Sequence, residues 1–173
     1  MSETKGRRDF LQILTVATGG TGAVAFAWPL VNSMNPAADV LALATVEVDL
    51  STVEVGQSIT VQWQGKPVFI RRRSEREVMQ AKNDDEAQLI DPQLDEERVV
   101  NSEWLVLIGI CTHLGCVPLG QKEGQPRGEY NGWFCPCHGS QFDSSGRIRK
   151  GPAPRNLDVP EYRFISDNVI RIG

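Results

Sequence analysis

The hydrophobic pattern divides the chain into a long apolar stretch near the N-terminus and a later part made of short, alternating segments. No charged residue occurs from Phe10 to Ala38, and the apolar stretch from Phe10 to about Val31 is long enough to cross about 30 Å of hydrocarbon as a helix. We therefore expect a tail at 1–9 and a membrane span at 10–31. Residues 32–45 are mostly small, with few packing anchors, and are expected to form a hinge.

Beyond this linker the pattern predicts β-strands. Thr45–Leu50 and Ile59–Trp63 are strand patterns, and the second alternates with a period of two, which is typical of a half-buried strand. After a turn at Gln64-Gly65-Lys66, the segment Pro67–Arg71 is expected to be the partner strand. Trp104–Ile110 is a continuous apolar run, which favours a strand buried on both faces.

The rest of the chain after residue 45 adds a charged insert and more strands. In the charged region 72–98, Ser74 precedes a Glu-rich turn, which predicts a short helix starting there. Trp133-Phe134, a strand-turn-strand around Asp143-Ser144-Ser145-Gly146, and a hairpin of Tyr162–Ile165 with Val169–Ile172 follow. Residues 46–173 are thus expected to form a mainly β head, an antiparallel sandwich with a helical insert.

All four cysteines and both histidines of the chain fall in two short boxes. The first box is Cys111-Thr112-His113-Leu114-Gly115-Cys116, and the second is Cys135-Pro136-Cys137-His138-Gly139-Ser140. Each box pairs its first cysteine with a histidine two or three residues later, so one tight loop can aim a thiolate and an imidazole at the same metal. Two such loops would supply two sulfur and two nitrogen ligands.

Ligand types alone leave both zinc and an iron-sulfur cluster open. A structural zinc usually takes knuckles of two cysteines separated by two to four residues. Here each box instead pairs a cysteine with a histidine and leaves Cys116 and Cys137 as a second matched pair. The spacing favours the cluster, and a zinc-binding interaction module is the alternative.

The two boxes resemble those of the Rieske iron-sulfur proteins, which read Cys-x-His-x-Gly-Cys and Cys-x-Cys-His-x-Ser. The match includes every ligand position. The resemblance implies a Rieske-type head with a small cluster-binding subdomain. It also implies a 2Fe-2S cluster with one iron held by two cysteines and the other by two histidines, here Cys111, Cys135, His113 and His138.

The second pair of cysteines indicates which branch of the Rieske family the chain resembles. In the family a bridging disulfide joins the residues that correspond to Cys116 and Cys137, whereas Rieske ferredoxins and ring-hydroxylating oxygenases generally lack this pair. The chain therefore resembles the high-potential members that serve quinol oxidation, the Rieske subunits of cytochrome bc1 complexes (ubiquinol:cytochrome c oxidoreductases) of the alphaproteobacterial and mitochondrial type.

The resemblance also assigns roles around the ligands. Ser140 would hydrogen-bond a bridging sulfide, Leu114 would shield the cluster and contact the quinol pocket, and the loop of Gly151 and Pro152 would cover the site. One position departs from the pattern: quinol-oxidising members usually carry Tyr where this chain has Phe142. Hydrogen-bond donors to the sulfurs raise the potential, so we expect a somewhat less oxidising cluster and slower quinol oxidation.

The resemblance implies the partners as well. His138, with His113 also exposed at the tip, would accept a hydrogen bond from ubiquinol in cytochrome b, and the head would then move to reduce cytochrome c1 in a complex expected to be dimeric. The runner-up is the small Rieske subunit of a periplasmic oxidase such as arsenite oxidase. A retained anchor and the long charged insert argue against that alternative.

Charge and the N-terminal motif bear on location. A net charge of −4 with scattered lysines and arginines gives no basic surface for nucleic acid. Arg7-Arg8 followed by Phe10-Leu11 resembles a twin-arginine (Tat) export signal, and Lys5 adds positive charge before the span. By the positive-inside rule the N-terminus is cytoplasmic, and a disulfide implies an oxidising compartment for the head. We expect a single-pass protein of the bacterial inner membrane with a retained anchor and a periplasmic head.

Overall fold

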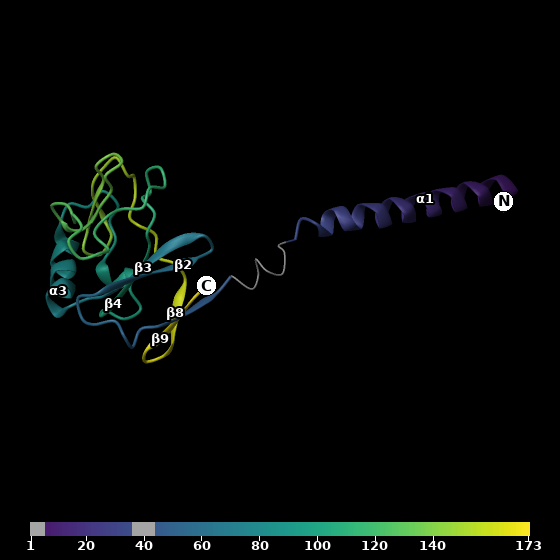
Figure 1. The fold of residues 1–173 in the computed structure, drawn as a ribbon. Coiled ribbons are helices and arrows are strands. Elements are labelled where there is room, and N and C mark those ends of the chain that lie inside the picture. Colours follow the sequence, from purple (N-terminus) through teal and green to yellow (C-terminus); the bar gives the residue numbers. More distant parts are fainter. Residues whose placement is uncertain (1–5, 36–43) are drawn as a thin grey trace. The chain divides into compact units, whose positions relative to one another are not determined.

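The computed structural model describes residues 6–35 and 44–173, which belong to two compact units divided near residue 42 (Figure 1). The first unit contains one helix, α1 (Arg7–Asn32). The second unit is the β-rich head. The segment 36–43, which makes up most of the predicted hinge, and the first five residues, including Lys5, lie outside the described residues.

Helix α1 is long and apolar enough to cross a membrane. Its apolar side chains, among them Phe10 and Trp28, are exposed in this unit, as expected for a helix whose natural surroundings are lipid. The hydroxyls of Thr15, Thr18 and Thr21 donate to backbone carbonyls in the preceding turn, so these polar groups need no water. The helix begins at Arg7, three residues before the predicted span, so it includes the arginine pair.

The head contains three antiparallel sheets of three strands each. In sheet order, the strands are β1 (Val46–Asp49), β9 (Val169–Ile172) and β8 (Tyr162–Ser166); β2 (Ser58–Trp63), β3 (Lys66–Arg72) and β4 (Trp104–Ile108); and β5 (Asn131–Phe134), β6 (Gln141–Asp143) and β7 (Ile148–Lys150). The predicted mainly β, antiparallel sandwich is confirmed.

The sheet β2-β3-β4 packs against apolar side chains on both of its faces. Val68, Ile70 and Val106 face one core, which also contains residues of β1 and β9. Phe69 and Leu107 face a second core shared with β5, β6 and the first cysteine of each box. Side chains alternate between the faces of a strand, and both faces of β3 and β4 are covered, which explains the continuous apolar run in β4.

The charged insert between β3 and β4 forms a short helix and two 3₁₀ turns. Helix α3 (Glu75–Asn83) begins where the sequence predicts it, with Ser74 as N-cap: the Ser74 hydroxyl accepts from the Glu77 backbone and the Glu77 carboxylate accepts from the Ser74 backbone. The 3₁₀ turns η1 (Asp84–Glu86) and η2 (Asp95–Arg98) complete the insert.

One strand prediction needs correction. The buried run after Trp104 is a strand only to Ile108, because Gly109 donates to the Pro67 carbonyl and the chain turns away toward the first box. A side chain at Gly109 would also overlap the ring of Phe69. The final hairpin of β8 and β9 is confirmed, and β9 also pairs with β1 in a sheet separate from β2-β3-β4.

Candidate metal centre

The two boxes fold into loops with the same backbone geometry. In the first, the Cys111 amide donates to the Cys116 carbonyl at 2.7 Å and the Gly115 amide donates to the Cys111 carbonyl at 3.0 Å. In the second, the amides of Cys135 and Gly139 make the equivalent bonds, at 2.8 and 2.9 Å. Each loop needs a glycine with positive φ, +83° at Gly115 and +82° at Gly139, which other residues rarely adopt.

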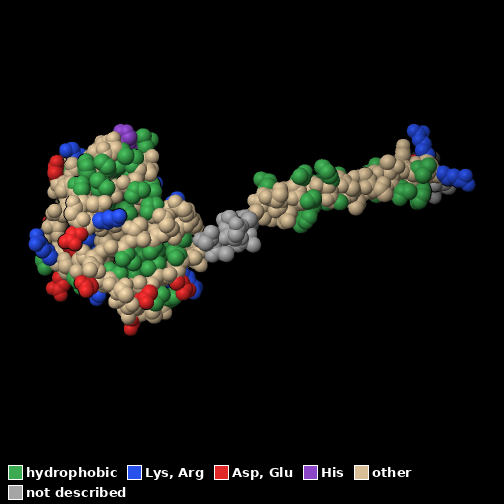
Figure 2. Space-filling model, viewed as in Figure 1, with side chains coloured by type: hydrophobic (Ala, Val, Ile, Leu, Met, Phe, Trp, Pro, Cys, Tyr) green, Lys and Arg blue, Asp and Glu red, His purple; other side chains and the backbone are tan. Residues whose placement is uncertain are grey.

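Strands β4 and β5 deliver these loops to one end of the head. The first box starts three residues after β4 ends, and the second starts directly after β5. In Figure 1 the green and yellow loops of this region gather at the end of the head opposite β8 and β9. Figure 2 shows exposed histidine atoms at this tip, next to hydrophobic side chains.

A disulfide between Cys116 and Cys137 joins the two loops, as the resemblance implied. The sulfur of Cys135 lies within 4.8 Å of both disulfide sulfurs. These three sulfurs do not make a metal site together, because two of them are already bonded to each other and cannot act as thiolates. Cys111 and Cys135 are the free thiols, and both are buried.

Two pairs of candidate ligands each come together: Cys111 lies near Cys135, and His113 lies near His138. Burial raises the pKa of the Cys135 thiol, and the neighbouring Cys111 adds to this, since the two side chains lie within hydrogen-bonding reach. The rings of His113 and His138 lie edge to face with centroids 4.7 Å apart. His113 is half-buried, whereas His138 is exposed.

One atom of this group is a buried polar atom without a partner. Nδ1 of His113 is shielded from solvent and has no hydrogen-bond partner in the part of the chain that the structure describes. Such an atom is costly unless it is satisfied, and a metal ligand is one way to satisfy it. Together with the two buried thiols and the His138 imidazole, it gives the two sulfur and two nitrogen donors that a cluster with mixed ligation requires, so the residues present fit a 2Fe-2S cluster.

The proline loop forms the third side of the site. The Ala153 amide donates to the Ser140 hydroxyl at 3.0 Å, and Ala153 itself packs into the core with both free cysteines. Ser140 is buried and keeps its own hydroxyl hydrogen available for another acceptor. Gly151 and Pro152 are exposed beside it.

Of two other predicted positions, one is exposed and the other is buried. Leu114 is 71% exposed at the tip, where an apolar side chain is available to a partner. Phe142 is 0% exposed and packs in the core that contains Cys111 and Cys135. Its ring offers no hydrogen-bond donor to that core.

Comparison with known proteins identifies the family of this head. The family model described as the Rieske [2Fe-2S] domain matches residues 45–163, which is more than half of the chain. The chain belongs to the Rieske family. A second model, described as the Tat signal of the ubiquinol-cytochrome c reductase Fe-S subunit, matches residues 1–37 of this Rieske protein.

Curated relatives match the Rieske chain over almost its whole length. The ubiquinol-cytochrome c reductase iron-sulfur subunit of Rhodospirillum rubrum is 58% identical over 96% of this chain and 91% of its own. The subunits of Rickettsia felis and Rhodobacter capsulatus are 59% and 49% identical over 96% of this chain, and over 93% and 95% of their own. A solved structure, described as hyperthermophilic respiratory complex III, aligns with a TM-score of 0.53 and 25% identity over 91% of this chain and 98% of its own.

The sequence did not reveal the hydrogen bonds that hold the loops against each other. Besides the Ala153 bond to Ser140, the hydroxyl of Thr112 donates to the Arg155 carbonyl at 2.6 Å and ties the first box of this Rieske head to the proline loop. A threonine between two ligand candidates was a weak signal for such a contact, because its acceptor lies 43 residues away along the chain.

Proposed function

We propose that this Rieske protein is the electron-transfer subunit of a respiratory or photosynthetic cytochrome bc1 complex, which oxidises ubiquinol and reduces cytochrome c1. The observation that carries the proposal is the arrangement at the tip. Both free thiols are buried, whereas the His138 imidazole and the Leu114 side chain are exposed there. An exposed imidazole beside an apolar contact suits a hydrophobic substrate that gives up a proton.

We assign the cluster ligands to Cys111 and Cys135 on one iron and to His113 and His138 on the other. The buried thiols and the unpartnered Nδ1 of His113 support this assignment. The cluster, when bound, would accept one electron. Imidazole ligands carry less negative charge than thiolates, which favours the reduced state and raises the potential.

The residues of the chain would accept the quinol proton and orient the quinol. A ring nitrogen of His138 that does not hold iron would accept the hydrogen bond and the proton of the quinol hydroxyl, because imidazole changes charge near neutral pH. His113 would hold a second proton in the same way. Leu114 would contact the quinol pocket, and Ser140, Gly151 and Pro152 would close the other side of the site.

The partners follow from this role. We infer contacts with cytochrome b at the ubiquinol site and with cytochrome c1 at the electron-accepting site, in a dimeric complex. The named relatives, which are iron-sulfur subunits of ubiquinol-cytochrome c reductase, support this assembly. No nucleic acid is involved in the proposed role.

The proposed location has α1 as a retained anchor in the bacterial inner membrane, with residues 1–9 cytoplasmic and the head periplasmic. The apolar composition of α1 and the Tat-signal match support it. The head is taken as 46–173, the span as 10–31 and the hinge as 32–45.

The alternatives have less support. An arsenite oxidase subunit is not favoured, because the curated relatives named above are ubiquinol-cytochrome c reductase subunits. A zinc-binding module would use the same four ligands but carry no electron.

A reductase assay in membranes tests the proposal. Ubiquinol-dependent reduction of cytochrome c is measured with the wild-type chain, with His138→Gln, and with Gln62→Ala on the exposed face of β2 as control. Loss of a ligand that also takes the proton is expected to lower the rate at least about 100-fold. Gln62→Ala should leave it unchanged, and full activity in His138→Gln would refute the proposed role.

A further inference from the structure

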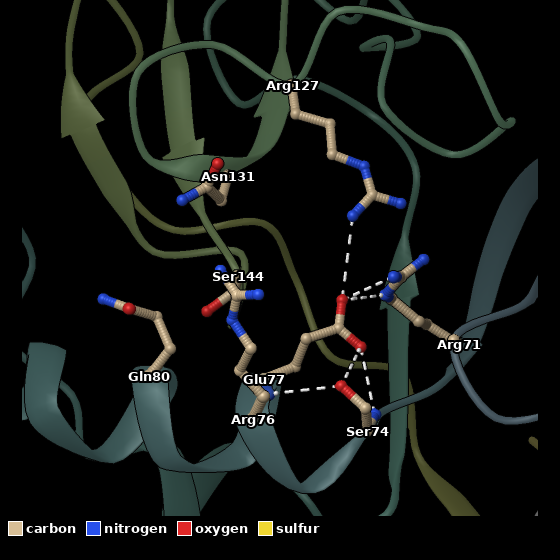
Figure 3. A pocket seen from close by; sticks show the side chains of 9 residues that line it. Arg71, Ser74, Arg76, Glu77, Gln80, Arg127, Asn131 and Ser144 are labelled. Carbon is tan, nitrogen blue, oxygen red and sulfur yellow. Dashed lines mark hydrogen bonds and ion pairs between the residues drawn. The ribbon is translucent and has the colours of Figure 1, made fainter.

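A cavity lies on the head, and none of the residues that line it belongs to either box. It has a volume of about 350 Å³ and lies where α3, the end of β3, the loop before β5 and the turn after β6 meet. Figure 3 shows the guanidinium groups of Arg71 and Arg127 directed toward the Glu77 carboxylate from two different segments. The cavity is also lined by Arg76, Gln80, Asn131 and Ser144.

The cavity contains more positive than negative charge. Arg71, Arg76 and Arg127 line it together with a single carboxylate, Glu77, which leaves two positive charges in excess. One carboxylate oxygen of Glu77 pairs with Arg71 and lies 3.7 Å from Arg127, and the other accepts from Ser74. Arg76 has no ion pair within residues 6–35 and 44–173.

Two of these arginines are partly buried, and they share a single carboxylate, that of Glu77. Arg71 is 8% exposed, and Arg127 is about two-thirds buried. Burial, together with the neighbouring charge of Arg71, lowers the pKa of Arg127, and Glu77 only partly offsets this. A second negative group in the cavity would relieve this strain between like charges.

One residue of the cavity wall carries a buried polar atom without a partner among the described residues. Ser144 is 7% exposed, and its hydroxyl oxygen has no hydrogen-bond partner among the described residues. The adjoining cavity, which shares Gly56, Arg71 and Arg127, includes Gln121, whose side-chain oxygen is also buried and unpartnered in the described head. Buried polar atoms of this kind are uncommon in folded proteins and often mark a missing ligand or water.

We propose that this cavity binds the phosphate group of a small phosphate monoester. The excess of two positive charges matches a phosphate dianion, and guanidinium groups bind phosphate oxygens with paired hydrogen bonds. The volume lies at the lower end of the range for small-molecule sites, which fits an ester with a short polar tail rather than a large nucleotide.

The same phosphate chemistry occurs in soluble monoesters and in the headgroup of phosphatidic acid. The test is calorimetric titration of the full-length, cluster-loaded protein in detergent. One arm uses glycerol 3-phosphate, and the other uses a short-chain phosphatidic acid below its micelle concentration, with short-chain phosphatidylcholine as the blank. Each arm is repeated with Arg76→Gln, Arg127→Gln and the control Arg163→Gln.

Saturable binding in at least one arm is expected, and each pocket variant should weaken it about tenfold or more, because each loses a charge-assisted hydrogen bond. Arg163 is exposed on β8 and loses the same charge, so Arg163→Gln should bind like wild type. Arg76 makes no ion pair in the described structure, so its variant should fold normally and keep its cluster content. Absence of binding in both arms, or equal weakening in Arg163→Gln, would overturn the site.

Discussion

At the scale of single residues, the candidate site depends on which polar atoms the core leaves without a hydrogen-bond partner. The sequence predicted the four proposed ligands from residue type and spacing, and the departure at Phe142 from its resemblance to the family. It could not predict that Nδ1 of His113 would be buried without a partner or that Ala153 would donate to Ser140. Those contacts depend on how three loops from distant parts of the chain pack together.

Phe142 offers a direct test at this scale. Phe142→Tyr is expected to raise the reduction potential of the cluster and the rate of quinol oxidation, because a phenol can donate a hydrogen bond to a ligand sulfur and stabilise the reduced state. Redox titration measures the potential. Phe164→Tyr adds the same hydroxyl in the other core and should leave the potential unchanged. An unaltered potential in Phe142→Tyr would contradict the role given to this position.

Glu77 is expected to make the free energy of unfolding depend on pH. Burial opposes its charge, but hydrogen bonds from Ser74 and Arg71 outweigh burial and lower its pKa below the usual 4.5. A carboxyl with a lowered pKa in the folded state stabilises the fold above the pKa of the unfolded state, and this contribution is lost as the pH falls through the folded value. The difference in unfolding free energy between wild type and Glu77→Gln should therefore shrink as the pH falls below 4.5.

Denaturant unfolding at a series of pH values between 6 and about 3 measures this difference. Glu54→Gln, which replaces an exposed carboxylate in the loop between β1 and β2, serves as the control. A constant difference between wild type and Glu77→Gln across the series would show that Glu77 does not act through its charge.

At the scale of elements, a buried ionic cluster fastens the insert to the strands that carry the second box. The Arg147 guanidinium, which is fully buried, donates to Asp143 on β6 at 2.8 Å, to the Ala81 carbonyl at the end of α3 at 2.8 Å and to the Gln93 carbonyl at 3.1 Å, and it pairs with Asp85 of η1. Arg98 adds bonds to the Ser145 and Leu157 carbonyls. The insert is thus part of the support of the site.

Replacing Arg147 tests this connection. Arg147→Leu leaves the buried Asp143 carboxylate without its nearest charged partner, and loss of one member of a buried pair typically costs about 3–5 kcal/mol. Arg171→Leu removes an exposed pair with Glu47, and this is expected to cost at most about 1 kcal/mol. Urea unfolding of the two variants compares them. Equal losses of stability would mean that the buried cluster does not hold the insert.

The sequence predicted these elements better than it predicted the contacts between them. Periodicity and the cap at Ser74 indicated the strands and α3, because those signals are local. The ionic cluster was not predicted, because Arg147 and Asp85 lie 62 residues apart and charged residues in a loop are usually solvated. The pairing of β9 with β1 also depends on contacts between the two ends of the head.

At the scale of the whole molecule, an apolar helix and a β head with two equivalent loops that hold the cysteines and histidines agree with the family. The central claim is that the head carries a histidine-ligated cluster that couples electron and proton transfer. Such coupling follows if each histidine keeps one ring nitrogen for a proton while the other holds iron.

The most direct test is a potentiometric titration of the full-length protein at several pH values, with electron paramagnetic resonance of the reduced cluster. We expect a high potential that falls as the pH rises above neutrality, because the oxidised form then loses protons from its histidines. A low potential that does not change with pH, or a protein without redox-active iron, would contradict the account.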